Sequence, residues 1–170
     1  MQQDELRLLL GEVGEGRRAL EKIDLLYRHY GSRFRDEGAR GLPDAVMLAE
    51  ILGNTYTCIE TVLFRISRVF ENHLDSERWH KHLLQKMHIE VPGLRPAVLS
   101  PETFKLLDEL RRFRHFKRYY YEFDYDWLRL EFLMTVYERM RPRLEADLDR
   151  FSGFLESLLV EADGLSGADS

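Results

Sequence analysis

The stretch covering residues 105–121 combines positive charge with phenolic hydroxyl groups, and it has the clearest capacity for chemistry in the chain. It carries six basic residues and two acidic ones before a run of tyrosines, although the whole chain has a formal net charge of −5. Helical spacing at i, i+3, i+4 and i+7 places four of its side chains on one face, namely Arg111, Arg114, His115 and Arg118. Guanidinium groups beside aromatic rings bind phosphates and stack on unpaired bases, which is how single-stranded RNA is often held.

The same stretch also has a purely structural interpretation. Its apolar residues recur at helical spacing and can form an inward-facing stripe, which consists of Leu106, Leu107, Leu110 and Phe113. The basic residues would then form a solvated face, and the tyrosines would pack beneath it or at an interface. Composition alone favours this interpretation over RNA binding, and both stay open on these grounds.

The histidines and the cysteine give no comparable signal. His80 and His82 are two residues apart on an expected helix and point to different sides. No cysteine or carboxylate completes a metal-ligand pattern with them. Cys58 lies within an apolar stretch, with no histidine at a telling spacing, which indicates a small buried residue rather than a nucleophile. We therefore predict neither a metal site nor a cofactor.

Helices must position these side chains, because apolar residues recur at helical spacing along most of the chain and useful strand-like alternation is absent. Ser100 followed by Pro101 indicates a helix start, since serine caps free amides and proline suits the first helical position. Pro142 is expected to kink or divide the last helix, and the glycines within residues 11–16 to loosen the first. The expected helices cover residues 4–34, 44–72, 76–87, 101–121 and 126–159. This pattern predicts an all-α, up-and-down bundle of about five helices.

Length and composition limit the class of protein. A chain of 170 residues, 44% apolar and 32% charged, can bury a core. We predict one helical domain over residues 1–163 and a disordered tail over residues 164–170. The acidic balance argues against a generally basic, DNA-coating protein. The single cysteine allows no internal disulfide, the N-terminus has no secretory apolar segment, and no apolar run reaches the ~20 residues of a membrane span. We therefore expect a cytoplasmic protein with no membrane partner.

Several segments resemble, in order, those of HepT-like proteins in the HEPN superfamily. The run Phe113–Tyr121 reads Phe-Arg-His-Phe-Lys-Arg-Tyr-Tyr-Tyr and resembles the family's signature segment. Tyr56–Glu60 resembles its tyrosine-to-glutamate segment on a central helix. Further segments that match in type and order are Trp79–Met87, Arg95–Pro96 and Leu107–His115. The resemblance extends from about Pro43 to Leu148.

This resemblance implies an all-helical homodimer that acts as a metal-independent, RNA-cleaving toxin and is paired with a small nucleotidyltransferase antitoxin. The family motif is an arginine, four residues, a histidine, one residue and a tyrosine. In this chain the arginine is Arg114 and the final tyrosine is Tyr121, whereas Tyr119 occupies the histidine position. Tyr121 corresponds to the tyrosine that some such antitoxins modify with AMP, so the resemblance makes it the candidate for AMPylation.

The replacement at Tyr119 bears on catalysis. The family's arginine neutralises the charge of the phosphorane and its histidine transfers protons, whereas tyrosine, with a reference pKa of about 10, is a poor base at neutral pH. His115 could substitute, although its direction on a helix differs by roughly 100° from that of Arg114. The candidate catalytic residues are therefore Arg114, Tyr119 and His115. The candidate RNA-binding residues are Arg111, Arg112, Lys117 and Arg118. The alternatives are a HEPN-type binding module that does not cleave, and a helical adaptor with no nucleic-acid role.

Overall fold

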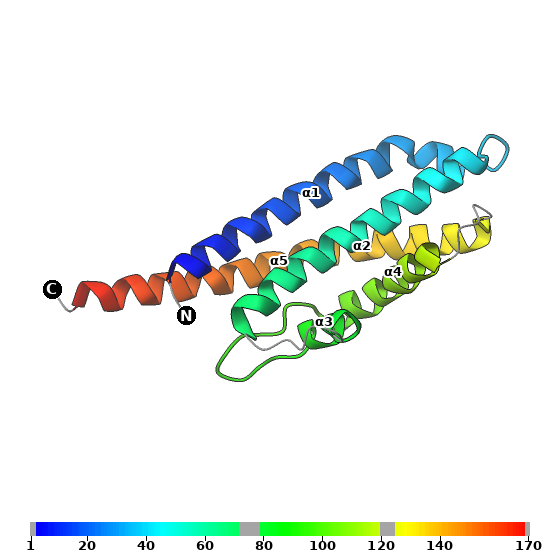
Figure 1. Cartoon of the computed structure of the whole chain (residues 1–170). Coiled ribbons are helices and arrows are strands. Elements are labelled where there is room, and N and C mark those ends of the chain that lie inside the picture. The colour runs from blue at the N-terminus through cyan, green and yellow to red at the C-terminus, as the bar shows by residue number, and fades with distance from the viewer. Residues whose placement is uncertain (1–2, 72–78, 120–124, 169–170) are drawn as a thin grey trace.

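The computed structural model describes residues 3–71, 79–119 and 125–168. The helices of these residues are α1 (Gln3–Arg35), α2 (Leu42–Phe70), α3 (Trp79–Met87), α4 (Pro101–Tyr119) and α5 (Trp127–Ala168). No strand occurs among the residues described. Figure 1 shows the long helices α1, α2 and α5 running side by side, with α4 against α2 and α5 and the short α3 towards one end. The all-α bundle of five helices predicted from the sequence is confirmed.

Helices α1 and α2 approach each other closely at Gly16. The glycines of residues 11–16 were expected to loosen α1, but this helix is continuous and Gly16 is buried within it. A Cβ atom added at Gly16 would lie 2.1 Å from Cγ2 of Val62 on α2. The missing side chain therefore allows the two backbones to approach, so this glycine serves packing rather than flexibility.

The start of α4 is fixed by its capping residue and by α5. The Ser100 hydroxyl accepts a hydrogen bond from the Thr103 amide at 3.3 Å, and Pro101 occupies the first helical position as predicted. The Ser100 amide donates to the carboxylate of Asp147 on α5 at 2.8 Å. Because Asp147 is buried, this contact joins the beginning of the basic helix to the core and positions the rest of it.

Arg95 lies in the connection between α3 and α4 and is buried near the end of α2. Its guanidinium pairs with Glu71. The same group donates to the carbonyl oxygens of Lys86, Ile89 and Pro96 at 3.0–3.2 Å. One buried side chain thus satisfies a carbonyl group in the last turn of α3 and two in the irregular segment that follows it.

Helix α5 contains Pro142 and is not divided by it. Buried residues continue on both sides of the proline, including Met140, Leu144 and Phe151. Packing of this apolar stripe against the core therefore keeps the helix continuous, although Pro142 has no amide hydrogen and cannot make the usual helical hydrogen bond. Of the two expected effects of Pro142, division of the helix does not occur, and a kink stays a prediction.

The remaining differences from the sequence prediction concern helix ends. Helix α5 continues to Ala168 rather than ending near Leu159, and residues 164–168 are helical where a disordered tail was expected. Leu158 and Leu159 pack partly against the core, which extends the apolar stripe of α5 towards its end. The cap expected for the third helix, at residues 75–76, lies outside the described residues.

Candidate nucleic-acid interface

Arg114 lies between α4 and α2, with its side chain 24% exposed. Its Nε donates to the Thr57 hydroxyl at 2.8 Å, and its Nη1 lies 3.3 Å from the Glu60 carboxylate. The guanidinium carbon is 5.8 Å from the centre of the Tyr56 ring, within the range of a cation–π contact. A short segment of α2 thus holds this arginine in one orientation.

Tyr56 is the buried aromatic residue beside Arg114. Burial raises the pKa of the Tyr56 hydroxyl far above its ordinary value of 10.0, and the negative charge of Glu60 raises it further. The positive charges of Arg111 and Arg114 oppose this shift only in part. The phenol is therefore neutral at physiological pH, and it provides a packing surface rather than a base.

Lys117 is a second cation of α4 that is directed towards α2. Its ammonium group pairs with Glu50, and its side chain passes close to Gly53. A Cβ atom at Gly53 would lie 3.6 Å from Lys117 Nζ, which is ordinary van der Waals contact. Two carboxylates of α2, Glu50 and Glu60, therefore neutralise two of the candidate site residues.

Other basic residues of α4 bind carboxylates of their own helix. The Nε of Arg111 donates to Asp108 at 2.7 Å. The guanidinium of Arg112 lies 2.8 Å from Asp108 and 3.7 Å from Glu109. The four cations with ion pairs, Arg111, Arg112, Arg114 and Lys117, thus face four acids, and Lys105 and Arg118 of the same helix add two exposed positive charges. The surface has a small positive excess rather than the strong one that the basic stretch suggests.

The other candidates lie toward solvent or at the end of α4. His115 and Arg118 are exposed, whereas Arg114 turns towards α2, in agreement with the helical angle between positions 114 and 115. Tyr119 is the last residue of α4, and its side chain is outside the described part of the structure. Tyr121 also lies outside the described residues. The roles of Tyr119 and Tyr121 therefore stay predictions.

Sequence reasoning gave no separate role to Thr57 or Glu50. Thr57 belongs to the segment that resembles the family's tyrosine-to-glutamate segment, so its position close to the motif arginine could have been inferred from that resemblance. Glu50 gave no signal, because its pairing with Lys117 depends on how α2 and α4 are aligned. That alignment depends on the packing of two helices, so the spacing of residues within either helix does not predict it.

Metal-ligating side chains, the cysteine and membrane-spanning helices were also considered from the sequence. Among the described residues, no cluster of three or more histidine, cysteine, aspartate or glutamate side chains could hold a metal ion. Cys58 is partly buried, its Sγ lies 3.5 Å from the Gly16 carbonyl oxygen, and burial raises the pKa of its thiol above 9.0. These features agree with a small packing residue. None of the helices, over the residues searched, combines the length and the apolar character of a membrane span.

The all-helical bundle, in which Thr57 and Glu60 of α2 hold Arg114 of α4, agrees with the HEPN type that the resemblance implies. A family model described as HepT-like protein matches residues 47–155, which include all of α3 and α4 and most of α2 and α5. The chain therefore belongs to the HepT-like family, as the resemblance indicated. Comparison with curated proteins and with solved structures gives no match.

Proposed function

We propose that this HepT-like chain forms a homodimer that binds RNA at the α2–α4 surface and cleaves it without a metal ion. The observation that supports this proposal is that α2 holds the Arg114 side chain in place through Thr57 and Glu60. Two segments that resemble the family, Tyr56–Glu60 and Phe113–Tyr121, are distant in sequence, and the contacts of Arg114 with Thr57 and Glu60 join them. A guanidinium with a fixed orientation at a solvent-accessible edge is suited to bind a phosphate group.

The proposed reaction is attack of a ribose 2′-hydroxyl on the adjacent phosphorus. As the new O–P bond forms, the bond to the 5′-oxygen of the next nucleotide breaks, which leaves a 2′,3′-cyclic phosphate and a 5′-hydroxyl. Arg114 neutralises the charge on the phosphorane. Because His115 and Arg114 of one subunit point in different directions, the proton of the 2′-hydroxyl is taken by His115 of the second subunit, at a cleft near the interface of the proposed homodimer. Tyr119 donates a proton or a hydrogen bond to the leaving oxygen.

The proposal includes a nucleotidyltransferase antitoxin that transfers AMP from ATP to the Tyr121 hydroxyl, which forms an O–P bond and releases pyrophosphate. The added phosphate would place negative charge beside the cations of α4 and compete with RNA for them. Intact-mass analysis after co-expression with such an enzyme should show AMP adducts that disappear in Tyr121→Phe. A full set of unmodified masses, or adducts that persist in Tyr121→Phe, would contradict this part of the proposal.

Tyr119 favours a second candidate function, namely RNA binding without cleavage. It occupies the position of the motif histidine, and a phenol is a poor base at neutral pH. The ion pairs of Arg114 and Lys117 are compatible with either function, because RNA phosphates would compete with the same carboxylates in both.

A cleavage assay in EDTA, with labelled tRNA and unstructured RNA, separates the two functions. The wild type is compared with Arg114→Ala, Tyr119→His and the control Arg139→Ala, whose arginine also pairs with a carboxylate of another helix, Glu102. Cleavage that is lost in Arg114→Ala and kept in Arg139→Ala supports the nuclease. Cleavage gained only in Tyr119→His supports the binding function. Equal cleavage by wild type and Arg114→Ala, or no RNA binding by any of them, would refute the proposed site.

A further inference from the structure

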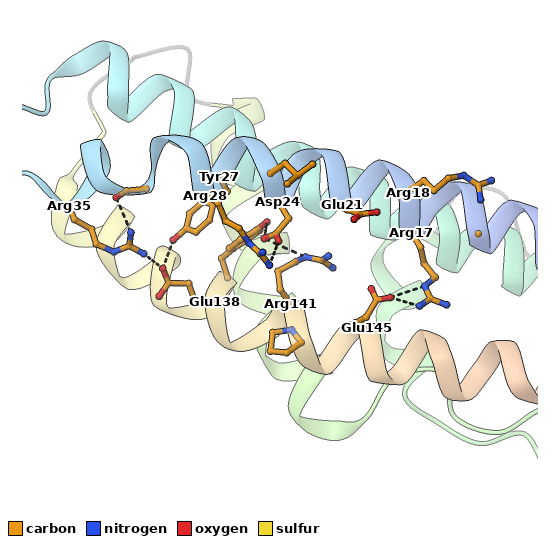
Figure 2. Close-up of a pocket in the computed structure, with 15 residues that line it drawn as sticks. Arg17, Arg18, Glu21, Asp24, Tyr27, Arg28, Arg35, Glu138, Arg141 and Glu145 are labelled. Carbon is orange, nitrogen blue, oxygen red and sulfur yellow. Dashed lines mark hydrogen bonds and ion pairs between the residues drawn. The ribbon is translucent and has the colours of Figure 1, made fainter.

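A groove with a volume of about 930 Å³ runs between α1 and α5. Every described residue that lines it belongs to one of these two helices, so it is separate from the α2–α4 surface. Figure 2 shows its charged side chains arranged along the facing sides of α1 and α5. Five arginines and four acids line it, although the chain as a whole is acidic. The acids are Glu21, Asp24, Glu138 and Glu145, and the arginines are Arg17, Arg18, Arg28, Arg35 and Arg141.

Ion pairs close both ends of the groove. At one end Arg17 donates to Glu145 at 3.0 Å and lies 2.6 Å from Asp149. At the other end Arg35 pairs with Glu138, and the Tyr27 hydroxyl donates to the same carboxylate at 2.7 Å. These pairs hold α1 and α5 at a fixed separation, so the space between them is part of the fold.

Arg141 lies in the middle of the groove close to the Tyr137 hydroxyl, and two of its nitrogen atoms lack a hydrogen bond of acceptable geometry within the described structure. Its side chain is only 14% exposed, yet within the described structure its buried Nε and Nη1 have no hydrogen-bond partner. The nearest carboxylate oxygen, Oδ1 of Asp24, is 3.9 Å from Nε, too far for a hydrogen bond. The same oxygen accepts from the Tyr137 hydroxyl at 2.9 Å, and the other oxygen of Asp24 lies 2.6 Å from Arg28.

A buried guanidinium whose N–H donors lack acceptors lowers the stability of the fold. An acceptor bound in the groove next to Nε and Nη1 of Arg141 would remove this cost. Two arginines, Arg28 and Arg141, lie beside the one carboxylate of Asp24, and Glu21 is a further acid of the groove on α1. A water molecule has only one oxygen and could accept from one or both donors without any charge to attract the two guanidinium groups. An oxyanion offers acceptor oxygens to Arg141 and is attracted by the two neighbouring guanidinium groups, and a phosphate offers more acceptor oxygens and more charge than a carboxylate.

We propose that the α1–α5 groove is a binding site for a small phosphate-bearing molecule, with Arg141 as its central ligand. The volume of the groove is within the range of small-molecule sites. Arg28 lies beside Arg141 at Asp24 and supplies the second cation. Arg18 lies along the same groove, and its ion pair with Glu15 is exposed at the surface, so it can turn towards a second phosphate.

Titration calorimetry of the full chain with inorganic pyrophosphate, in phosphate-free buffer, tests the site. The wild type should bind saturably, and Arg141→Lys, which keeps the charge but loses the planar fork, should bind at least about tenfold more weakly. Arg143→Lys is the matched control, because Arg143 is an exposed arginine of the same helix that does not line the groove. Citrate, the carboxylate arm, should bind more weakly than pyrophosphate.

A second variant distinguishes a ligand site from a structural cluster. Asp24→Asn keeps an acceptor for Tyr137 but removes the negative charge beside Arg141, so it should bind pyrophosphate more tightly than the wild type. Equal affinities of wild type and Arg141→Lys, no binding by the wild type, or preference for citrate would each overturn the proposal. RNA affinity measured in parallel should be unchanged in Arg141→Lys, so the groove and the proposed RNA site can fail independently.

Discussion

The close contact at Gly16 makes a quantitative prediction about stability. In Gly16→Ala the new methyl carbon would lie 2.1 Å from Cγ2 of Val62, whereas carbon atoms in contact are about 3.5–4.0 Å apart. Val62 is buried, and a valine in a helix has one strongly preferred rotamer, so the clash cannot be relieved cheaply by rotation. Helices α1 and α2 must therefore move apart or strain their side chains.

The expected magnitude follows from two opposing terms. Overpacking of a core typically costs about 1–3 kcal/mol, and replacement of glycine by alanine inside a helix gains about 1 kcal/mol from intrinsic propensity. Gly11 is an exposed position of the same helix where a Cβ atom would meet nothing within 4 Å. Gly11→Ala should therefore show the propensity gain alone. The difference between the two variants isolates the packing term, which we expect to be about 1–3 kcal/mol.

Urea unfolding monitored by circular dichroism measures these free energies of unfolding directly. Thermal melts give a second readout, since each kcal/mol corresponds to roughly 2–4 °C for a chain of this size. Gly16→Ala should lower the free energy of unfolding less in the Val62→Ala background than in the wild type, because Val62→Ala removes the methyl group that clashes. If Gly16→Ala proved as stable as Gly11→Ala, the close approach of α1 and α2 at this point would be wrong.

Two further predictions concern the capping carboxylate and the cysteine. Burial raises the pKa of Asp147, but hydrogen bonds from Thr103, Ser100 and Arg150 outweigh it and hold this pKa below its ordinary value of 3.8. Asp147→Asn should therefore lower the free energy of unfolding by about 1–3 kcal/mol at neutral pH. That difference should shrink as the pH falls below 3.8 and through the lowered pKa, which urea unfolding at a series of acid pH values would show. Burial raises the pKa of the Cys58 thiol above 9.0, so it should react with a thiol reagent much more slowly in the native protein than in urea, and equal rates would contradict its packing role.

The helices could be predicted because their determinants are local. Apolar spacing identified the long helices, and Ser100 with Pro101 located the start of α4, where the structure has its cap. Local reasoning did not predict that α5 continues through Pro142 and on to Ala168. At Pro142 the continuity of α5 comes with burial of neighbouring residues such as Met140 and Leu144, which local propensity does not include.

The ion pairs of the candidate site could not be predicted in the same way. Spacing along α4 identified its basic residues, but their carboxylate partners Glu50 and Glu60 are on α2, and the pairing depends on the alignment of two helices. The sequence contains one local signal of the α1–α5 groove, which is an acidic residue on the buried face of α1. Asp24 lies four residues after Leu20 and three before Tyr27, so a carboxylate interrupts the buried face of α1. A buried acid at such a position predicts a partner elsewhere in the fold, and the structure supplies Arg28, Tyr137 and Arg141.

The pairing of Arg114 with Glu60 constrains how the proposed RNA site can work. A free guanidinium would attract phosphate more strongly, but it would sample many orientations. Thr57 and Glu60 engage Nε and Nη1, which fixes the plane of the group, while Nη2 carries two further N–H donors. The cost is electrostatic, because the charge of Glu60 opposes an approaching phosphate and weakens ground-state binding. A phosphorane bears more negative charge than a phosphodiester, so it gains more from the oriented donors. An arginine held in this way is therefore better suited to stabilise a transition state than to capture RNA, and affinity has to come from exposed cations such as Arg118.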